Sequence, residues 1–503
     1  MPAMDLATNW WRPDSTPGVP QYTGTPGVPE YAGTPGVPEY AGTPGVPEYA
    51  GTPGVPQYIG GAQSHPTAGS RVAFNALVSF TVILLLSPQI YLPALKSIRI
   101  ALLAAGLAIA AHLLDSSMRR RPIARFSPEV GVATALVAWS LITIPLSYWP
   151  GGSVMVLTDH YLKAIAFFWL ICTVVTTTDR VKVLAWTFVL CSIPLAATGV
   201  NNYLSGTFLY TGIPGLNRIY GYSGGSGLVG NPNDLALMLN LIIPIAAAML
   251  VSARTVGART LAGFALLLNI VGVVVTFSRA GFLTLAAILL MLLAVLARRR
   301  SPFAAAALLA AALLVPPFLP EGYVDRVSTI ADIDADETGS AQGRWLDFGK
   351  ALDIVVKNPV TGVGIGQDIL ALNQERGEDW TSVHNAYLQY AVDLGVPGVL
   401  LFMWLHLTCY RSARGVEKAT AGRADPALRD LGHLAAGVQI SLVAFAVAAM
   451  FHPIAYQFYF FCVGGLAVAL RHAYQSEETR LGTRSADALR HHDLALEPEP
   501  SVS

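Results

Sequence analysis

The chain has 503 residues, of which 53% are hydrophobic and only 13% are charged. A soluble globular domain has about 25% charged residues, so this composition excludes a single soluble domain and favours a protein with many membrane-spanning helices. The formal net charge is zero, which gives no reason to expect nucleic acid as a partner.

The chain begins with a low-complexity tail over residues 1–70. Within this tail, a nine-residue unit of the pattern Thr-Pro-Gly-Val-Pro-Gln/Glu-Tyr-Xaa-Gly occurs five times between Thr16 and Gly60. Its prolines and glycines oppose both helix and sheet, and each unit has too few apolar side chains to form a core. We expect a disordered cytoplasmic tail, which serves either as a spacer or as a repeated tyrosine handle for a partner protein.

Apolar segments of about 17 to 22 residues follow one another from Arg71 onward, and the separation near Ser278 is the least distinct. A helix of this length crosses the ~30 Å hydrocarbon core of a bilayer. The sequence predicts about twelve membrane helices, near residues 72–94, 98–115, 130–149, 161–178, 181–199, 234–252, 258–276, 280–297, 302–319, 395–410, 433–451 and 455–471. We therefore expect an all-α membrane domain over residues 71–472 and a cytoplasmic tail over residues 473–503.

The positions of Lys and Arg predict the orientation of these helices. If the N-terminal tail is cytoplasmic and the helices alternate, the strongly basic short loops all fall inside, including 119–121 and 298–300. Cytoplasmic loops of membrane proteins carry such an excess of positive charge. We therefore expect both termini in the cytoplasm. Three polar segments then face outward, at residues 201–233, 277–281 and 320–395.

The longest polar segment, residues 320–395, is expected to be a large extracytoplasmic loop that carries most of an active site. Trp345 and Phe348 belong to an apolar pattern of helical period, which predicts an amphipathic helix opened by Arg344 on the membrane surface. A second helical pattern begins at His384, with Tyr387 on the same face. Histidine at this position is either a general base or a capping residue.

Arg279 lies between two apolar segments with almost no loop around it. Arginine at membrane depth is energetically costly and usually has a partner, and its guanidinium group suits phosphate. The alternative is an interfacial arginine that reaches lipid headgroups. Asn231 or Asn233 is expected to cap the following helix, and Asn385 is suited to hydrogen bonding with a sugar.

The sequence indicates no metal or nucleotide site. The acidic run at residues 332–337 has Glu337 at the position where a calcium loop needs glycine. The glycine-rich run at residues 362–366 lacks the Gly-Lys-Ser/Thr ending of a phosphate-binding loop. The cysteines all lie in apolar segments and form neither a disulfide framework nor a zinc cluster, at Cys172, Cys191, Cys409 and Cys462. We expect no cofactor and no metal.

Several motifs in combination resemble the O-antigen ligase and Wzy-type polymerase superfamily of bacterial membrane glycosyltransferases. The resemblance covers residues 72–472, without the N-terminal repeats, and family members often carry Glu where Asp393 stands. The motifs are Gly230-Asn231-Pro232-Asn233-Asp234-Leu235-Ala236, Thr276-Phe277-Ser278-Arg279-Ala280-Gly281, Gly343-Arg344-Trp345, and the stretch from Gly362 through His384-Asn385 to Gly398.

The resemblance implies transfer of a glycan from a polyprenyl diphosphate lipid to an acceptor at the outer face of the bacterial cytoplasmic membrane. Arg279 and Arg344 would hold the diphosphate, and His384 would assist attack by the acceptor hydroxyl. Such a displacement inverts the anomeric configuration and needs neither metal nor nucleotide. The expected substrate-binding residues are Arg218, Asn231, Asn233, Ser278, Asn385 and Tyr387.

Three functions remain open at this point. A polymerase would add the glycan to another lipid-linked repeat unit, and we favour it because polymerases serve many exopolysaccharides. A ligase would use lipid A core or a protein as acceptor. A lipid-linked glycan flippase should carry paired charges or broken helices near the bilayer midplane. The candidate charges instead gather at the expected outer face, and His406 is the clearest polar residue well inside a span, which favours an enzyme over a flippase. In the first two cases the N-terminal repeats would suit contact with polysaccharide-assembly proteins.

Overall fold

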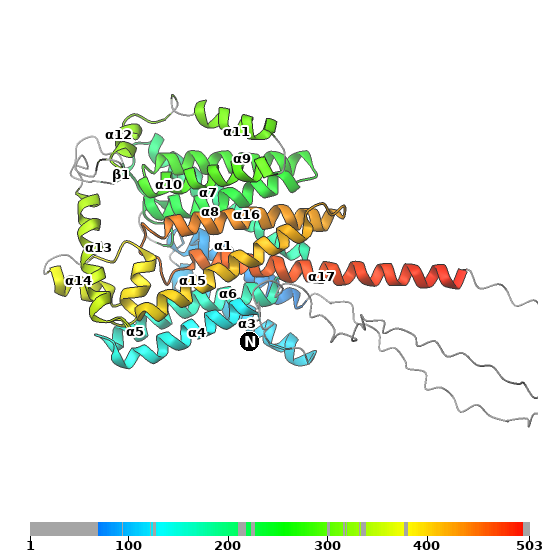
Figure 1. Ribbon diagram of the computed structural model, residues 1–503, viewed down its shortest axis with the longest axis horizontal. Coiled ribbons are helices and arrows are strands. Elements are labelled where there is room, and N and C mark those ends of the chain that lie inside the picture. Colours follow the sequence, from blue (N-terminus) through cyan, green and yellow to red (C-terminus); the bar gives the residue numbers. More distant parts are fainter. Residues whose placement is uncertain are drawn as a thin grey trace, which may run out of the picture. The chain divides into compact units, whose positions relative to one another are not determined.

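The computed structural model of the chain describes most of residues 69–495. Residues 1–68, 93, 121, 124–126, 210–217, 223–226, 299–301, 315–316, 318, 331, 333–338, 377–380 and 496–503 are not described. The predicted disordered tail therefore lies outside the described residues, except for its last two positions. The described residues are almost entirely helical (Figure 1), with one antiparallel pair of two-residue strands, Phe208–Leu209 (β1) and Arg218–Ile219 (β2).

The part of the chain before the long loop supplies twelve of the described helical segments. They are α1 (Arg71–Leu86), α2 (Ala94–Ile98), α3 (Ile100–Met118), α4 (Pro128–Thr143), α5 (Pro150–Val156), a π-helical turn (Leu157–Tyr161), α6 (Leu162–Val174), α7 (Thr178–Leu204), α8 (Pro232–Ser252), α9 (Val256–Val275), α10 (Arg279–Arg298) and α11 (Pro302–Leu314). Two short 3₁₀ turns complete this part, at Pro88–Ile90 and Ile144–Leu146.

The remaining part of the chain contains three helices of the long loop and three long helices. They are α12 (Tyr323–Ser328), α13 (Ser340–Lys357), α14 (Asp368–Arg376), α15 (Ala386–Thr420), α16 (Pro426–Ala448) and α17 (Phe458–Ala495). In Figure 1, α12, α13 and α14 lie together at the left-hand end of the long helices. The predicted loop with amphipathic helices is thus a layer at one end of the bundle.

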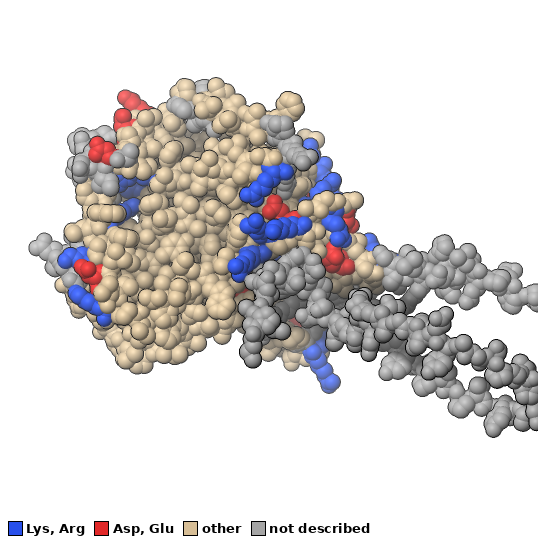
Figure 2. Space-filling view, in the orientation of Figure 1, with Lys and Arg blue, Asp and Glu red and all other residues tan. Residues whose placement is uncertain are grey.

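Nine helical segments in the described part of the chain are long and apolar enough to cross a membrane. The three remaining predicted spans coincide with α1, α11 and α17. Figure 2 shows a broad band without charged side chains across the middle of the visible face, with charged residues towards its two ends. This arrangement confirms the predicted all-α, multi-pass membrane fold. The predicted separation near Ser278 is also confirmed, because α9 ends at Val275 and α10 begins at Arg279.

Helices α8 and α16 form the centre of the bundle. In each, 78% of the apolar window is buried by other helices, more than in any other candidate span of the described residues. Helix α8 packs against α7, α9, α10 and α16. Asn231 caps α8, because its Oδ1 accepts a hydrogen bond from the amide of Asp234 at 2.9 Å. The central helix therefore begins at one of the predicted site motifs.

Helix α15 is broken at Gly395, whose backbone (φ 69°, ψ −174°) is not helical. The break frees carbonyl groups of the preceding turn. Those of Val392 and Asp393 accept hydrogen bonds from the amides of Val363 and Gly364, each at 2.9 Å. The glycine-rich run thus pairs with the broken helix, which gives it a structural role distinct from nucleotide binding.

A buried ion pair joins α4 to α17. Nη2 of Arg471 lies 3.0 Å from Oε2 of Glu129, and the two side chains are 5% and 0% exposed. The hydroxyl of Ser412 on α15 also donates to Glu129. When the sequence analysis argued against a flippase, it named only His406 as a polar residue inside the spans. It did not predict the buried ion pair or the break in α15.

Candidate active site

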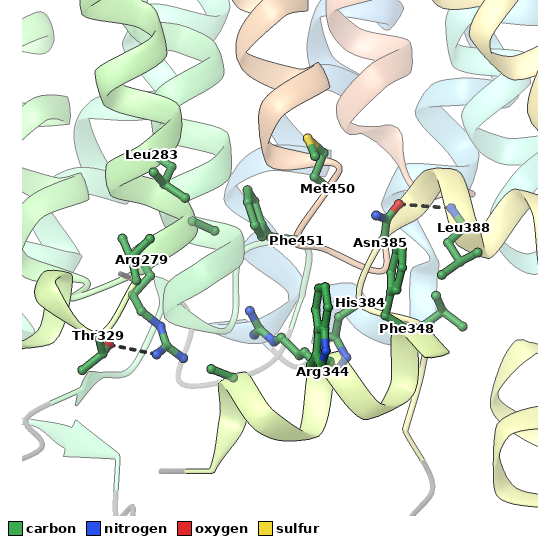
Figure 3. Close-up of a pocket in the computed structure, with 15 residues that line it drawn as sticks. Arg279, Leu283, Thr329, Arg344, Phe348, His384, Asn385, Leu388, Met450 and Phe451 are labelled. Carbon is green, nitrogen blue, oxygen red and sulfur yellow. Dashed lines mark hydrogen bonds between the residues drawn. The ribbon is translucent and has the colours of Figure 1, made fainter. Parts of the chain in front are cut away.

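A cavity of about 440 Å³ at one end of the bundle brings together the three predicted catalytic residues (Figure 3). Arg279 comes from α10, Arg344 from α13, and His384 from the segment before α15. Asn385 and Thr329 add polar groups to the wall. The remaining wall is almost entirely apolar and consists of Ala280, Leu283, Ile330, Ala341, Trp345, Phe348, Val383, Leu388, Met450 and Phe451.

Arg279 is the first residue of α10 and is held at the edge of this cavity. Its Nη1 donates a hydrogen bond to Oγ1 of Thr329 at 3.0 Å, which connects α10 to the segment after α12 (Figure 3). The preceding Phe277 adopts a left-handed backbone with φ 52°, so the chain turns sharply between α9 and α10. The hydroxyl of Ser278 accepts from the amide of Gly281 at 3.1 Å and caps the new helix.

Arg344 lies in the second turn of α13, because the helix begins at Ser340. The prediction that Arg344 opens this helix was therefore wrong by about one turn, although the predicted helix exists. Figure 3 shows the Arg344 side chain extending from α13 toward the side of the cavity where Arg279 lies. Next to it, Trp345 is 71% exposed and stacks on Phe348 with 5.8 Å between the ring centroids.

Positive charge around the cavity is not limited to the two predicted catalytic arginines. Burial, together with the smaller effects of the nearby charges of Arg326, Arg344 and Arg279, lowers the pKa of Arg218 to about 10. Arginines from α10, α12 and α13 are thus within electrostatic reach of Arg218 in β2. The sequence analysis missed Arg326, which belongs to the polar segment that was expected to carry the site.

Three predicted substrate-binding residues bond to one another instead of lining the cavity. Oδ1 of Asn233 accepts hydrogen bonds from Nη2 of Arg218 at 3.0 Å and from Oγ of Ser278 at 2.8 Å. This arrangement ties β2 and the start of α10 to the first turn of α8. Asn231 also stays outside the cavity wall, as the cap of α8. Asn233 and Ser278 therefore hold Arg218 and the start of α10 in place, and they do not line the cavity.

His384 precedes α15, which begins at Ala386, so the prediction that a helix begins at His384 was wrong by two residues. Asn385 is the cap, because its Oδ1 accepts from the amides of Tyr387 at 3.0 Å and Leu388 at 3.1 Å. Tyr387 lies outside the cavity wall and donates its hydroxyl to the carbonyl of Ala446 at 3.1 Å. The Asn385 side chain lines the cavity, with its oxygen used by the helix.

Burial and charge keep the imidazole of His384 neutral. Burial lowers the pKa of His384 to about 4, with a further contribution in the same direction from the positive charge of Arg344. Its Nδ1 is buried and has no hydrogen-bond partner in the described part of the chain. A neutral imidazole beside fixed cations can accept a proton from a hydroxyl group.

A buried carboxylate network holds the segment that carries His384. Asp368 accepts from the amide of Val383 at 2.9 Å, and its own amide donates to Oδ1 of Asp393 at 2.8 Å. Oδ2 of Asp393 accepts from the hydroxyl of Tyr456 at 2.9 Å. The network therefore joins α14, α15 and the α16–α17 loop directly behind the cavity.

His452 is a second histidine near the cavity that the sequence analysis did not single out. It is 3% exposed and follows two residues of the cavity wall, Met450 and Phe451. Its Nδ1 lies 2.8 Å from the carbonyl of Ala448, whereas its Nε2 has no hydrogen-bond partner within the described residues. Burial lowers the pKa of His452 to about 4. The sequence signal would have been a histidine in the loop between two predicted spans.

Residues 264–403 match the family model described as O-antigen ligase. The matched range contains Arg279, Arg344 and His384, which the cavity brings together. The match supports the resemblance drawn from the sequence motifs over this range, and residues 264–403 are similar to the O-antigen ligase family. A comparison with curated proteins finds no match.

The O-antigen ligase region does not by itself distinguish a polymerase from a ligase, and the catalytic roles of its residues stay predictions. Most of the acidic run at residues 332–337 lies outside the described residues. Among the residues that are described, no group of three or more His, Cys, Asp or Glu side chains is placed to hold a metal ion. The arginines supply the positive charge that the described residues place at the site.

Proposed function

We propose that this protein polymerises polyprenyl-diphosphate-linked glycan repeat units at the outer face of the bacterial cytoplasmic membrane. The observation that carries the proposal is the convergence of Arg279, Arg344 and His384 on one largely apolar cavity. Two guanidinium groups suit a diphosphate, and a neutral imidazole suits an acceptor hydroxyl. Among the described residues of the cavity wall, no other side chain carries a positive charge that could bind an anionic donor.

In this proposal the donor diphosphate lies between Arg279 and Arg344, with its polyprenyl chain along the apolar wall formed by Leu283, Met450 and Phe451. The fixed guanidinium groups stabilise negative charge that grows on the diphosphate as the sugar bond breaks. Thr329 keeps Arg279 in position through its hydrogen bond. The protein thereby binds the leaving group more tightly as the reaction advances.

The chemical step is a single displacement. The acceptor hydroxyl oxygen attacks the anomeric carbon, and its proton passes to the His384 imidazole. The bond between the anomeric carbon and the diphosphate oxygen breaks, and its electron pair leaves with the lipid diphosphate. The new glycosidic bond forms on the opposite face of the sugar, so the configuration inverts. The energy of the reaction comes from the donor bond, and no nucleotide is consumed.

Substrate binding would raise the basicity of His384. The charge of Arg344 contributes to the low pKa of His384, about 4. A bound diphosphate places negative charge beside the same imidazole, and opposite charge stabilises the protonated form. We expect the pKa of His384 to be higher in the donor complex than in the free protein, which makes it a better base when the donor is present.

The deciding experiment measures the size of lipid-linked and surface glycan in cells without this protein, complemented with wild type or His384→Ala. Accumulation of single repeat units on the lipid carrier supports a polymerase. Long chains on the carrier that never reach a final acceptor would instead indicate a ligase. Normal glycan with His384→Ala, but not in the deletion strain, would contradict a catalytic role for His384.

The arginine clamp is tested with Arg344→Ala and Arg279→Ala in the same cells. Both variants should lose most of the glycan product at normal protein levels, by about 100-fold or more in rate, because each removes a charged contact to the leaving group. Lys350→Ala is the matched control, since Lys350 lies on α13 outside the cavity wall. Retained transfer in both arginine variants would disprove the clamp.

The break in α15 and the ion pair between Glu129 and Arg471 do not support the flippase alternative. The break is closed by backbone hydrogen bonds from the glycine-rich run, so its polar groups are satisfied within the protein. The ion pair is buried and joined by Ser412. A transport path would need such groups to face a water-filled route.

A further inference from the structure

A second and larger cavity, of about 770 Å³, lies between α1, α3 and α6. It shares no lining residue with the active-site cavity. Its wall is mainly apolar, with Phe80 and Leu84 from α1 and Phe167 and Leu170 from α6. Helix α3 contributes small residues, including Gly106, which leave room beside its backbone. We call this cavity the α1–α3–α6 groove.

Polar residues gather at one end of the α1–α3–α6 groove. Arg99 and Gln89 lie in the connection between α1 and α3, and Lys163 lies at the start of α6. This polar end is on the same side of the bundle as the active site. Tyr91, in the same connection, packs against Tyr222, which follows β2, with 5.7 Å between the ring centroids. The strand β2 in turn carries an arginine of the active-site cluster.

The charge at this polar end favours an anionic group. Arg99 is exposed and has no ion-pair partner within the described residues, and α3 begins at the next residue with the positive end of its helix dipole. Lys163 is 3.4 Å from the carboxylate of Asp159, and the two side chains are 50% and 60% exposed. The charges of Arg99 and Lys163, less that of Asp159, leave a net charge of plus one at this end of the groove. Oε1 of Gln89 is buried without a hydrogen-bond partner in the part of the chain that is described.

An apolar groove with a cationic entrance fits a long-chain lipid with a phosphate headgroup. The proposed polymerase requires two such lipids at once, because donor and acceptor glycans are both attached to a polyprenyl diphosphate. The active-site cavity, with its arginine cluster, accounts for one of them. Resting on that proposed function, we propose that the α1–α3–α6 groove binds the carrier lipid of the second glycan, with its diphosphate at Arg99 and Lys163.

Native mass spectrometry of the purified full-length protein tests this proposal by counting bound molecules of a long-chain polyprenyl diphosphate. Wild type should bind two. The double variant Arg99→Glu/Lys163→Glu should bind one, with at least about tenfold weaker affinity at the second site, because two charge-assisted contacts become repulsive. The double variant Arg279→Ala/Arg344→Ala should also bind one, and the combination of all four changes should bind none.

Arg119→Glu is the matched control, because Arg119 caps the opposite end of α3. It should bind two lipids, as wild type does. A single lipid in wild type, removed only by the Arg279/Arg344 changes, would overturn the groove proposal and leave the proposed active site intact. The proposal would also be overturned if phosphatidylglycerol occupied the second site as readily as the polyprenyl diphosphate does, since the groove would then bind an ordinary membrane lipid. If the Arg279/Arg344 changes removed no lipid, the active-site proposal would fail instead.

Discussion

The amide of Val383 donates a hydrogen bond to Oδ2 of Asp368 at 2.9 Å. This bond fixes the backbone one residue before His384, and it connects the proposed base to a carboxylate that is itself buried. Burial raises the pKa of Asp368 above its usual range, and hydrogen bonds from the amide of Val383 and from Gln389 oppose this rise. The position of His384 therefore depends on a residue outside the cavity wall.

Replacing Asp368 with Ala should reduce glycan transfer by about tenfold or more, because the freed amide of Val383 lets His384 move. Asp368→Asn should lose less, since one side-chain oxygen remains to accept the bond. The measurement is the rate of transfer at matched protein levels. Asp353→Ala, on the exposed face of α13, is the control and should be neutral. An unchanged rate in Asp368→Ala would show that the bond does not position His384.

Acid should destabilise the folded protein through its two site histidines. Burial lowers the pKa of His384 from 6.5 to about 4 and that of His452 by a similar extent. Between those values these two histidines bind more protons in the unfolded chain than in the folded protein, so their contribution to stability falls as the pH is lowered from about 6.5 toward 4, while the raised pKa of Asp368 acts in the opposite direction. Thermal unfolding in detergent at pH 7.5 and pH 5 measures this fall. The variants His384→Gln and His452→Gln should each show a smaller loss, and a loss equal to that of wild type contradicts this account.

Glycine is required at the break in α15. A Cβ at Gly395 would lie 2.2 Å from the carbonyl oxygen of Val360, and φ is 69° there. Gly395→Ala should therefore destabilise the protein and reduce the amount found in the membrane, because backbone atoms cannot move aside as the end of a flexible side chain can. Gly349→Ala is the control, since a Cβ in the middle of α13 would meet nothing within 4 Å. Yield and thermal unfolding of the two variants should differ clearly, and equal values would show that the break tolerates a side chain.

The ion pair of Glu129 and Arg471 should matter more when one partner is removed than when both are. Glu129→Ala leaves a buried guanidinium without this carboxylate and should cost about 3–5 kcal/mol of unfolding free energy. The double variant Glu129→Leu/Arg471→Leu should cost less than Glu129→Ala. Asp159→Ala, which breaks the exposed pair with Lys163, should cost at most about 1 kcal/mol. Additive losses in a double-mutant cycle of Glu129 and Arg471 would rule out a coupled pair.

The proposed orientation is tested by labelling with a thiol reagent that does not cross the membrane. The four native cysteines are buried, so they should react little, and labelling of an introduced cysteine can be measured above a low background. Trp345→Cys, at the exposed surface of α13, should react in intact cells. Ala424→Cys, in the turn between α15 and α16, should react only after the membrane is opened. The reverse pattern would place the active-site cavity on the cytoplasmic side.

Some parts of the site could be predicted from sequence, and others could not. Arg279, Arg344 and His384 stand out because each is polar or charged at the edge of an apolar segment. The hydrogen bonds that join Asn233 to Arg218 and Ser278 could not be predicted from the sequence, since these residues are 15 and 45 positions apart in the chain. They meet only because α8 and α10 pack together at their first turns.

Hydropathy is a local property of the chain, and for this reason the membrane class, the helical fold and the approximate spans could be predicted from the sequence alone. A run of about 20 apolar residues is stable in a bilayer as a helix whatever its neighbours are. The convergence of side chains is a property of packing. Only the tertiary structure brought Arg326 and His452 to the site, broke α15 at Gly395 and opened the α1–α3–α6 groove, because each of these depends on helices that meet across long distances in the chain.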